Sequence, residues 1–182
     1  WLDPEKTTPY EFYQFWINQD DRDVVKYLKY FTFLSKEEID ALAEKVKTEP
    51  WKREAQKTLA REVTKFVHGE KAVEEAERIT AALFSGDVAD LTANEIEQGF
   101  KNMPSVEVAN QKQNIILWLV DDTKIEPSRR QAREDVKNGA IRINGEQITD
   151  ENAEIDPSTH FDGKFVIVRK GKKRYWLARV KK

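Results

Sequence analysis

The sequence contains no cysteine among its 182 residues. Disulfide frameworks, thiolate metal sites and cysteine nucleophiles are therefore excluded. The absence of disulfides fits a reducing compartment, and we expect a cytoplasmic protein. Long apolar runs are also lacking: the longest, Ile115 to Val120, falls far short of the ~20 residues of a membrane span. We therefore expect a short buried element at this position and no membrane partner.

Histidine is scarce, and the motifs of catalysis are missing. The two histidines, His68 and His160, lie in unrelated segments without a carboxylate or serine pattern around them. We find no metal-ligand spacing, no nucleophile elbow and no phosphate-cradling glycine loop. His68 precedes Gly69 at a predicted helix end, where a cation suits the helix dipole, so we interpret it as a cap. We expect no catalytic residue and no metal site.

Negative charge is scarce near the end of the chain. The net charge is −2, but residues 127–182 hold 14 Lys and Arg against 8 Asp and Glu, whereas residues 1–126 hold 17 against 25. The stretch from Lys164 to Lys182 contains nine basic residues and no acidic one. Such a segment often binds a polyanion, and a merely solvated basic surface is the alternative. The chain starts at Trp1 without a signal peptide, which suggests a piece of a longer protein.

The first hundred residues carry the start and stop signals of successive helices. Helix-start signals precede the apolar stripes at Thr8-Pro9, Ser35–Glu38 and Thr92–Glu95. Pro50 is predicted to begin a longer helix that stops at Gly69. The large side chains of the first helix are interpreted as core: Tyr10, Phe12, Tyr13, Phe15 and Trp16.

These signals predict a helical bundle over residues 1–102. The segment 103–112, which contains Pro104, breaks the helical pattern and is predicted to be a linker. Residues 113–182 then form a second, smaller domain, which begins with the short apolar helix of "NIILWLVDD".

A basic helix follows in "SRRQAREDVKNG". Ser128 is placed to cap it and Gly139 to stop it. Ala132 and Val136 lie four residues apart on the inward face, which leaves three arginines on the outward arc: Arg129, Arg130 and Arg133. A packed core does not require three guanidinium groups so close together.

Strands are predicted after this helix. Asn144-Gly145 is a strong hairpin signal, and "KFVIVRKGKKRYWLARV" contains two alternating stretches joined at Lys170-Gly171. The turn between them presents five cations that repel one another unless a polyanion screens them: Arg169, Lys170, Lys172, Lys173 and Arg174. The fold class is therefore α+β, with a helical bundle followed by two helices and short antiparallel strands.

The segment "SRRQAREDVKNGAIRINGE" resembles the αL motif, a small RNA-binding module found in a ribosomal small-subunit protein. The resemblance implies that guanidinium groups form bidentate contacts with phosphates while the hairpin supplies a rigid edge against the RNA backbone. We therefore name eight candidate RNA-binding residues: Arg129, Arg130, Arg133, Arg169, Lys170, Lys172, Lys173 and Arg174.

Nearly the whole chain resembles one family. "WLDPEKTTPYEFYQFWINQDDRDVVKYLKYFTFLSKEEI", "AQKTLAREVTKFVHGE" and "ALFSGDVADLTANEIEQGF" resemble the helical anticodon-binding domain of bacterial tyrosyl-tRNA synthetases. The resemblance implies a ligase that joins tyrosine to its tRNA through a tyrosyl-adenylate, with ATP and magnesium. It implies tyrosine tRNA as the partner, docked by its anticodon stem and long variable arm.

In that family the nucleotide fold, the tyrosine pocket and the homodimer contact lie in an N-terminal half that these residues do not match. We therefore expect this chain to bind no cofactor, to be inactive alone and to be monomeric. Two alternatives are an αL-module protein of ribosomal or RNA-modification type, and a helical protein-interaction module whose acidic residues meet a basic partner.

Overall fold

The computed structural model describes residues 1–182 and divides them into two compact units, Trp1–Thr80 and Ala81–Lys182. The division falls inside helix α5 (Glu70–Ser85), and not at the predicted linker, residues 103–112. The difference has a physical reason. Residues 81–102 pack on the sheet of the second unit, where the Tyr175 hydroxyl donates to the Leu83 carbonyl at 3.0 Å and the Phe100 ring meets the Tyr175 ring edge-on.

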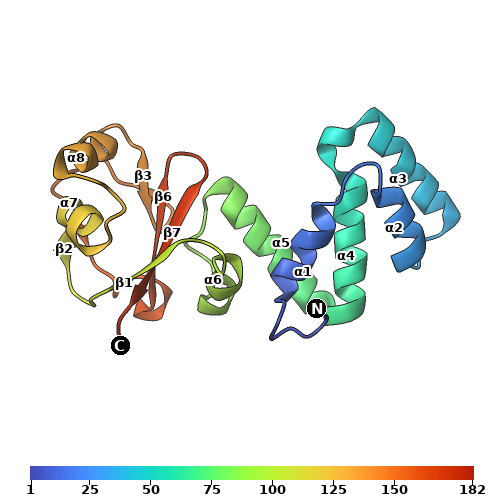
Figure 1. Ribbon diagram of the computed structural model, residues 1–182, viewed down its shortest axis with the longest axis horizontal. Helices are drawn as coiled ribbons and strands as arrows, with labels where there is room; N and C mark the ends of the chain where they lie inside the picture. Colours follow the sequence, from blue (N-terminus) through green and yellow to red (C-terminus); the bar gives the residue numbers. More distant parts are fainter. The chain divides into compact units, whose positions relative to one another are not determined.

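The first unit is helical, as the sequence predicts (Figure 1). Before α5 its elements are α1 (Pro9–Ile17), α2 (Val24–Phe31), α3 (Lys36–Thr48), the 3-10 turn η1 (Pro50–Lys52) and α4 (Glu54–His68). The Thr8 hydroxyl accepts from the Glu11 amide at 3.2 Å and the Ser35 hydroxyl from the Glu38 amide at 3.1 Å. These bonds confirm the two predicted N-caps, because each satisfies an amide left unpaired by the helix start.

The core of this unit forms where α1, α2 and α3 pack on α4. Its buried apolar residues include Phe12, Val24, Leu28, Ile39, Ala55, Leu59 and Val63. The prediction that Phe15 belongs to the core is wrong, because 61% of its surface is exposed. α1 carries large apolar side chains around much of its circumference, and only one side of it faces α4.

Two further predictions for this unit are wrong in detail. Pro50 begins η1 rather than the long helix, because Arg53 adopts a left-handed conformation (φ 50°) that separates η1 from α4. His68 does not act as a charged cap. Its ring packs edge-on against Phe12 at 5.0 Å between centroids, and burial lowers the pKa of its imidazole, which favours the neutral form.

The second unit is built on a five-stranded sheet with the order β1-β7-β6-β3-β4. Its strands are β1 (Ser105–Val108), β3 (Ile141–Ile143), β4 (Glu146–Gln147), β6 (Phe165–Lys170) and β7 (Arg174–Val180). A separate small ladder joins β2 (Gln113–Asn114) to β5 (Glu154–Ile155). Together with the helices, this arrangement confirms the α+β class.

Helices cover both faces of the sheet (Figure 1). On one face lie α7 (Ile115–Leu117), the π-helical turn η2 (Trp118–Asp122) and α8 (Arg129–Lys137), whose apolar side chains share a core with Ile141, Val166 and Val168. The other face is covered by the end of α5 and by α6 (Ala93–Gly99), which starts with the predicted capping box of Thr92 and Glu95. β6 is therefore buried on both faces.

The predicted linker contains a strand. Ser105–Val108 pairs in parallel with β7, and the Leu177 amide donates to the Pro104 carbonyl at 3.0 Å. The turn at Asn144-Gly145 is the predicted hairpin, with φ values of 51° and 86° at its two central residues. None of the helices combines the length and apolar composition that crossing a bilayer requires.

Candidate nucleic-acid interface

α8 presents its arginines to solvent because its apolar side is narrow. Ser128 caps the helix by accepting from the Gln131 amide at 3.1 Å, and Ala132 and Val136 are fully buried against the core. Arg129, Arg130 and Arg133 are all exposed. Arg129 pairs with Asp121 at 3.0 Å, with both side chains about half exposed, and such a surface pair is easily exchanged for another anion.

Arg130 and Arg133 have no side-chain partner within the protein. They are three residues apart on α8, so their side chains project as neighbours. Each guanidinium keeps all five N–H donors free, in a planar arrangement that matches two oxygens of a phosphate.

The turn between β6 and β7 supplies a second group of cations. Lys172, Lys173 and Arg174 are exposed, and the Arg174 guanidinium lies over the Trp176 ring at 4.9 Å from its centroid. Stacking on an indole orients the guanidinium plane while its outer N–H groups stay accessible.

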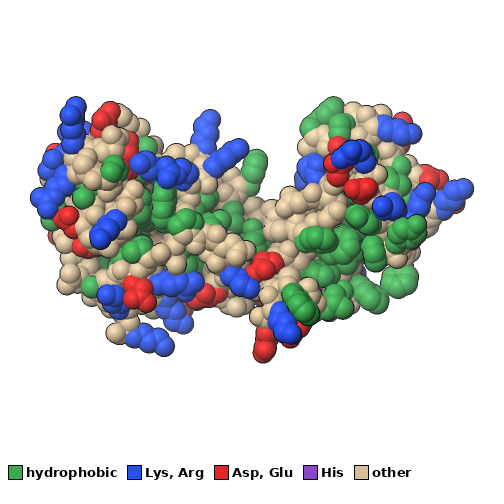
Figure 2. Space-filling model, in the orientation of Figure 1, with side chains coloured by type: hydrophobic (Ala, Val, Ile, Leu, Met, Phe, Trp, Pro, Cys, Tyr) green, Lys and Arg blue, Asp and Glu red, His purple; other side chains and the backbone are tan.

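The turn and α8 are neighbours. The Gly171 amide donates to the Ala140 carbonyl at 2.9 Å, just after the end of α8, and Lys170 contacts Asp135 on the helix. Figure 2 shows blue side chains projecting from the region of α8 and from the tip of the β6–β7 hairpin. We call the exposed residues of these two elements the cationic surface: Arg129, Arg130, Arg133, Lys172, Lys173 and Arg174.

Two of the eight candidate residues, Arg169 and Lys170, do not belong to this surface because their side chains bond within the unit. Lys170 has only 23% of its side chain exposed and pairs with Glu126 at 3.0 Å and Asp135 at 3.3 Å. Arg169 is half-buried; its Nη2 donates to the Lys172 carbonyl at 2.6 Å and its guanidinium lies over the Tyr175 ring. Both side chains are engaged inside the unit, so we do not include them among the phosphate contacts proposed below.

Glu126 and Asp135 were not singled out in the sequence. Burial raises the pKa of Glu126, and the nearby Lys170 only partly offsets this. For Asp135, burial acts in the raising direction, but contacts with Glu126, Lys170 and Gln131 outweigh it and lower the pKa. Burial likewise opposes the charge of Lys170, but the two carboxyl groups raise its pKa overall. The three groups therefore hold Lys170 as a cation and Asp135 as its anion.

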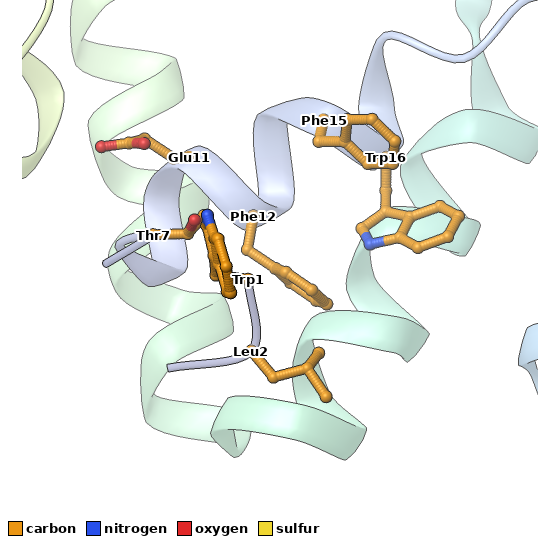
Figure 3. A pocket seen from close by; sticks show the side chains of 7 residues that line it. All are labelled: Trp1, Leu2, Thr7, Glu11, Phe12, Phe15 and Trp16. Atoms are coloured by element: carbon orange, nitrogen blue, oxygen red, sulfur yellow. The ribbon is translucent and has the colours of Figure 1, made fainter. Parts of the chain in front are cut away.

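The first unit exposes large apolar side chains. Those at least half exposed or close to it are Trp1, Leu2, Phe15, Tyr30, Phe31, Phe33, Trp51 and Phe66. Several of them line hollows, one of about 460 Å³ beside Trp1, Leu2 and α1, drawn in Figure 3. Another, of about 350 Å³, lies between Leu2, Tyr30, Phe33 and Phe66. We call the seven of these residues that line the two hollows the apolar face: Trp1, Leu2, Phe15, Tyr30, Phe31, Phe33 and Phe66. Contiguous exposed apolar groups of this kind are typical of interfaces.

The site has no feature of a metal centre, since no three His, Cys, Asp or Glu side chains come together in a metal-binding arrangement.

Comparison with known proteins assigns both units. The family model described as "Tyrosine--tRNA ligase SYY-like C-terminal domain" matches residues 95–178, and the model "tRNA synthetases class I (W and Y)" matches residues 1–85. The "Tyrosine--tRNA ligase" of Limosilactobacillus reuteri is 80% identical over 181 residues, which cover 100% of this chain and 43% of that protein. The chain belongs to the tyrosine–tRNA ligase family.

Two further proteins similar to this chain are a curated relative and a solved structure. The enzyme of Lactiplantibacillus plantarum is 77% identical over 181 residues, again 100% of this chain and 43% of the relative. A solution structure of a tyrosyl-tRNA synthetase C-terminal domain is 48% identical, with 55% of this chain and 100% of that chain covered and a TM-score of 0.44. The chain spans less than half the length of its curated relatives. It includes their C-terminal domain, which the first family model matches.

Proposed function

We propose that this chain docks tyrosine tRNA for a tyrosine–tRNA ligase, whose catalytic part is the portion of the relatives that the chain does not span. The observation that supports the proposal most is the cationic surface. Two groups of exposed cations, one on α8 and one on the β6–β7 turn, lie on neighbouring elements within the residues that match the C-terminal domain of the family.

The chemistry of the cationic surface suits a folded RNA. Free guanidinium groups at Arg130 and Arg133 can each take two phosphate oxygens, and the lysines of the turn act as point charges. Such contacts orient the RNA more than they read its bases. The hairpin at Asn144-Gly145 is rigid, because Asn144 exchanges hydrogen bonds with both backbone groups of Ile167, at 2.8 Å each.

By resemblance to the family, we place the cationic surface between the anticodon stem and the long variable arm of the tRNA. Footprinting of tyrosine tRNA with this chain, in parallel with a variant tRNA that lacks the variable arm, tests the placement. We expect protection of the variable arm and a weaker complex with the shortened tRNA. Equal affinity for both tRNAs, or for an unrelated tRNA of the same length, would contradict the proposal.

We further propose that the chain alone does not activate tyrosine, because ATP, magnesium and tyrosine bind elsewhere in the complete enzyme. ATP–pyrophosphate exchange measured with tyrosine and the purified chain should stay at background, while a full-length relative serves as the positive control. The homodimer, the monomeric state of this chain and its place in the cytoplasm stay predictions from the family resemblance; sedimentation of the chain decides the second.

The apolar face fits this proposal. It includes Trp1 and Leu2, and the unit that carries it matches the class I synthetase model. We propose that the missing part of the enzyme covers it. The match of residues 1–85 to synthetases also favours the ligase over a ribosomal or RNA-modification protein.

A further inference from the structure

The side chain of Lys170 sits at the meeting point of three elements. Its Nζ atom lies 3.0 Å from Glu126 Oε1 and 3.3 Å from Asp135 Oδ2. Glu126 belongs to the segment between η2 and α8, Asp135 to α8, and Lys170 is the last residue of β6. The side chains are 0%, 16% and 23% exposed respectively, so the network is largely closed to solvent.

We propose that Lys170, together with Glu126 and Asp135, is a positioning residue for RNA docking and not a phosphate ligand. It fixes α8, with Arg130 and Arg133, at a set place beside the β6–β7 turn. This inference rests on the proposed function, since it concerns how the two groups of the cationic surface are held together.

Lys170 is not free to bind RNA. If its ammonium turned outward to meet a phosphate, the largely buried Asp135 carboxylate would lose its cation and the fully buried Glu126 carboxyl would lose a polar partner, and buried groups left unpaired in this way are strongly unfavourable. Exposed neighbours on the same turn, such as Lys173, meet no such penalty. The sequence gives these lysines equal weight, and the structure separates them.

α8 needs such support because its apolar contact is small. Only Ala132 and Val136 are buried on this nine-residue helix, and both have small side chains. Gln131 extends the network, since its Nε2 donates to Asp135 Oδ1 at 3.0 Å. The Glu126 amide donates to the Leu119 carbonyl at 3.0 Å, which connects the charged network to η2 and thereby to the core. Orientation of α8 therefore depends on the charged network as well as on packing.

Two neighbouring substitutions on α8 separate positioning from electrostatics. Asp135→Ala and Glu134→Ala each remove one negative charge beside the cationic surface, and each brings in the same helix-favouring residue. Glu134 is exposed and has no side-chain partner. If charge alone matters, or if Lys170 binds phosphate once released, both variants bind tyrosine tRNA more tightly than the unchanged chain.

If the network positions α8, the two substitutions should affect the affinity for tyrosine tRNA differently. We expect Asp135→Ala to weaken binding of tyrosine tRNA about three- to tenfold and Glu134→Ala to tighten it or leave it unchanged, with titrations of the 182-residue chain at one salt concentration. Tighter binding by Asp135→Ala would overturn the inference.

Hydrogen exchange of the RNA-free chain provides a second measurement that does not depend on the proposed function. The amides of α8 should exchange faster in Asp135→Ala and in Lys170→Met than in Glu134→Ala, while those of β6 and β7 stay protected. If α8 exchange is unchanged, the network does not hold the helix and the inference fails. If exchange changes as expected but the unchanged chain binds no tyrosine tRNA, the proposed function fails and the structural role of Lys170 stands.

Discussion

Removing both free guanidinium groups of α8 should weaken RNA binding without affecting the fold. Arg130 and Arg133 are exposed and their side chains make no hydrogen bond or ion pair in the protein, so the Arg130→Ala plus Arg133→Ala variant leaves no buried group unpaired. Its melting temperature should therefore equal that of the unchanged chain. Ala also favours the helix slightly more than Arg does.

The size of the effect follows from how many phosphates the double variant can no longer bind. A charge-assisted hydrogen bond at an exposed site contributes about 1 to 2 kcal/mol, so the pair should cost about 2 to 4 kcal/mol, or roughly 30- to 700-fold in Kd. If about five cations of the cationic surface each neutralise a phosphate, the slope of log K against log salt is roughly −4, and the double variant should reduce its magnitude by about 1.5.

Titration of tyrosine tRNA at several salt concentrations measures both quantities. The matched control is Lys164→Ala plus Lys181→Ala, which removes two exposed cations from the opposite end of the β6–β7 ladder. The control should keep most of the affinity. An equal loss in both variants would show that binding depends on net charge alone, and an unchanged affinity of the arginine variant in low salt would refute the docking surface.

Three further predictions concern stability. Gly145→Ala should destabilise the chain by about 1 to 2 kcal/mol in denaturant titration, because φ is +86° and the new Cβ would lie 3.1 Å from the Gly86 carbonyl. His68 is half-buried against Phe12, and this burial lowers the pKa of its imidazole, so the unfolded state gains the proton first. Stability should therefore fall as pH drops below about 6.5, and His68→Gln should flatten that dependence. Thr92→Ala should cost about 1 kcal/mol by removing the cap of α6, measurable as a lower denaturation midpoint.

Local signals predicted much of the fold. The caps at Thr8, Ser35 and Ser128 and the turn at Asn144-Gly145 depend on a few consecutive residues, and each forms as expected. Pairings between distant segments were not predictable. The four residues of β1 follow Pro104 and look like a loop, because their partner strand lies far along the chain.

The candidate site also has one feature that local sequence predicts and one that it does not. Exposure of the arginines followed from helical periodicity, since Ala132 and Val136 define the buried side of α8. The inward position of Lys170 did not, because its partners, Glu126 and Asp135, are distant in sequence and carry no motif. A run of five cations gives no sign of which one is withdrawn into the protein.

The parallel pairing of β1 with β7 bears on the order in which the protein is made. Ser105 faces Leu177 in that ladder, so β1 leaves the ribosome roughly 4 to 14 seconds before its partner at usual elongation rates. Helices α1 to α4 can pack during that interval from segments already synthesised. Until β7 is synthesised, β1 and β6 lack the strand that pairs with both of them. We therefore expect aggregation or chaperone binding of the nascent chain mainly at this stage.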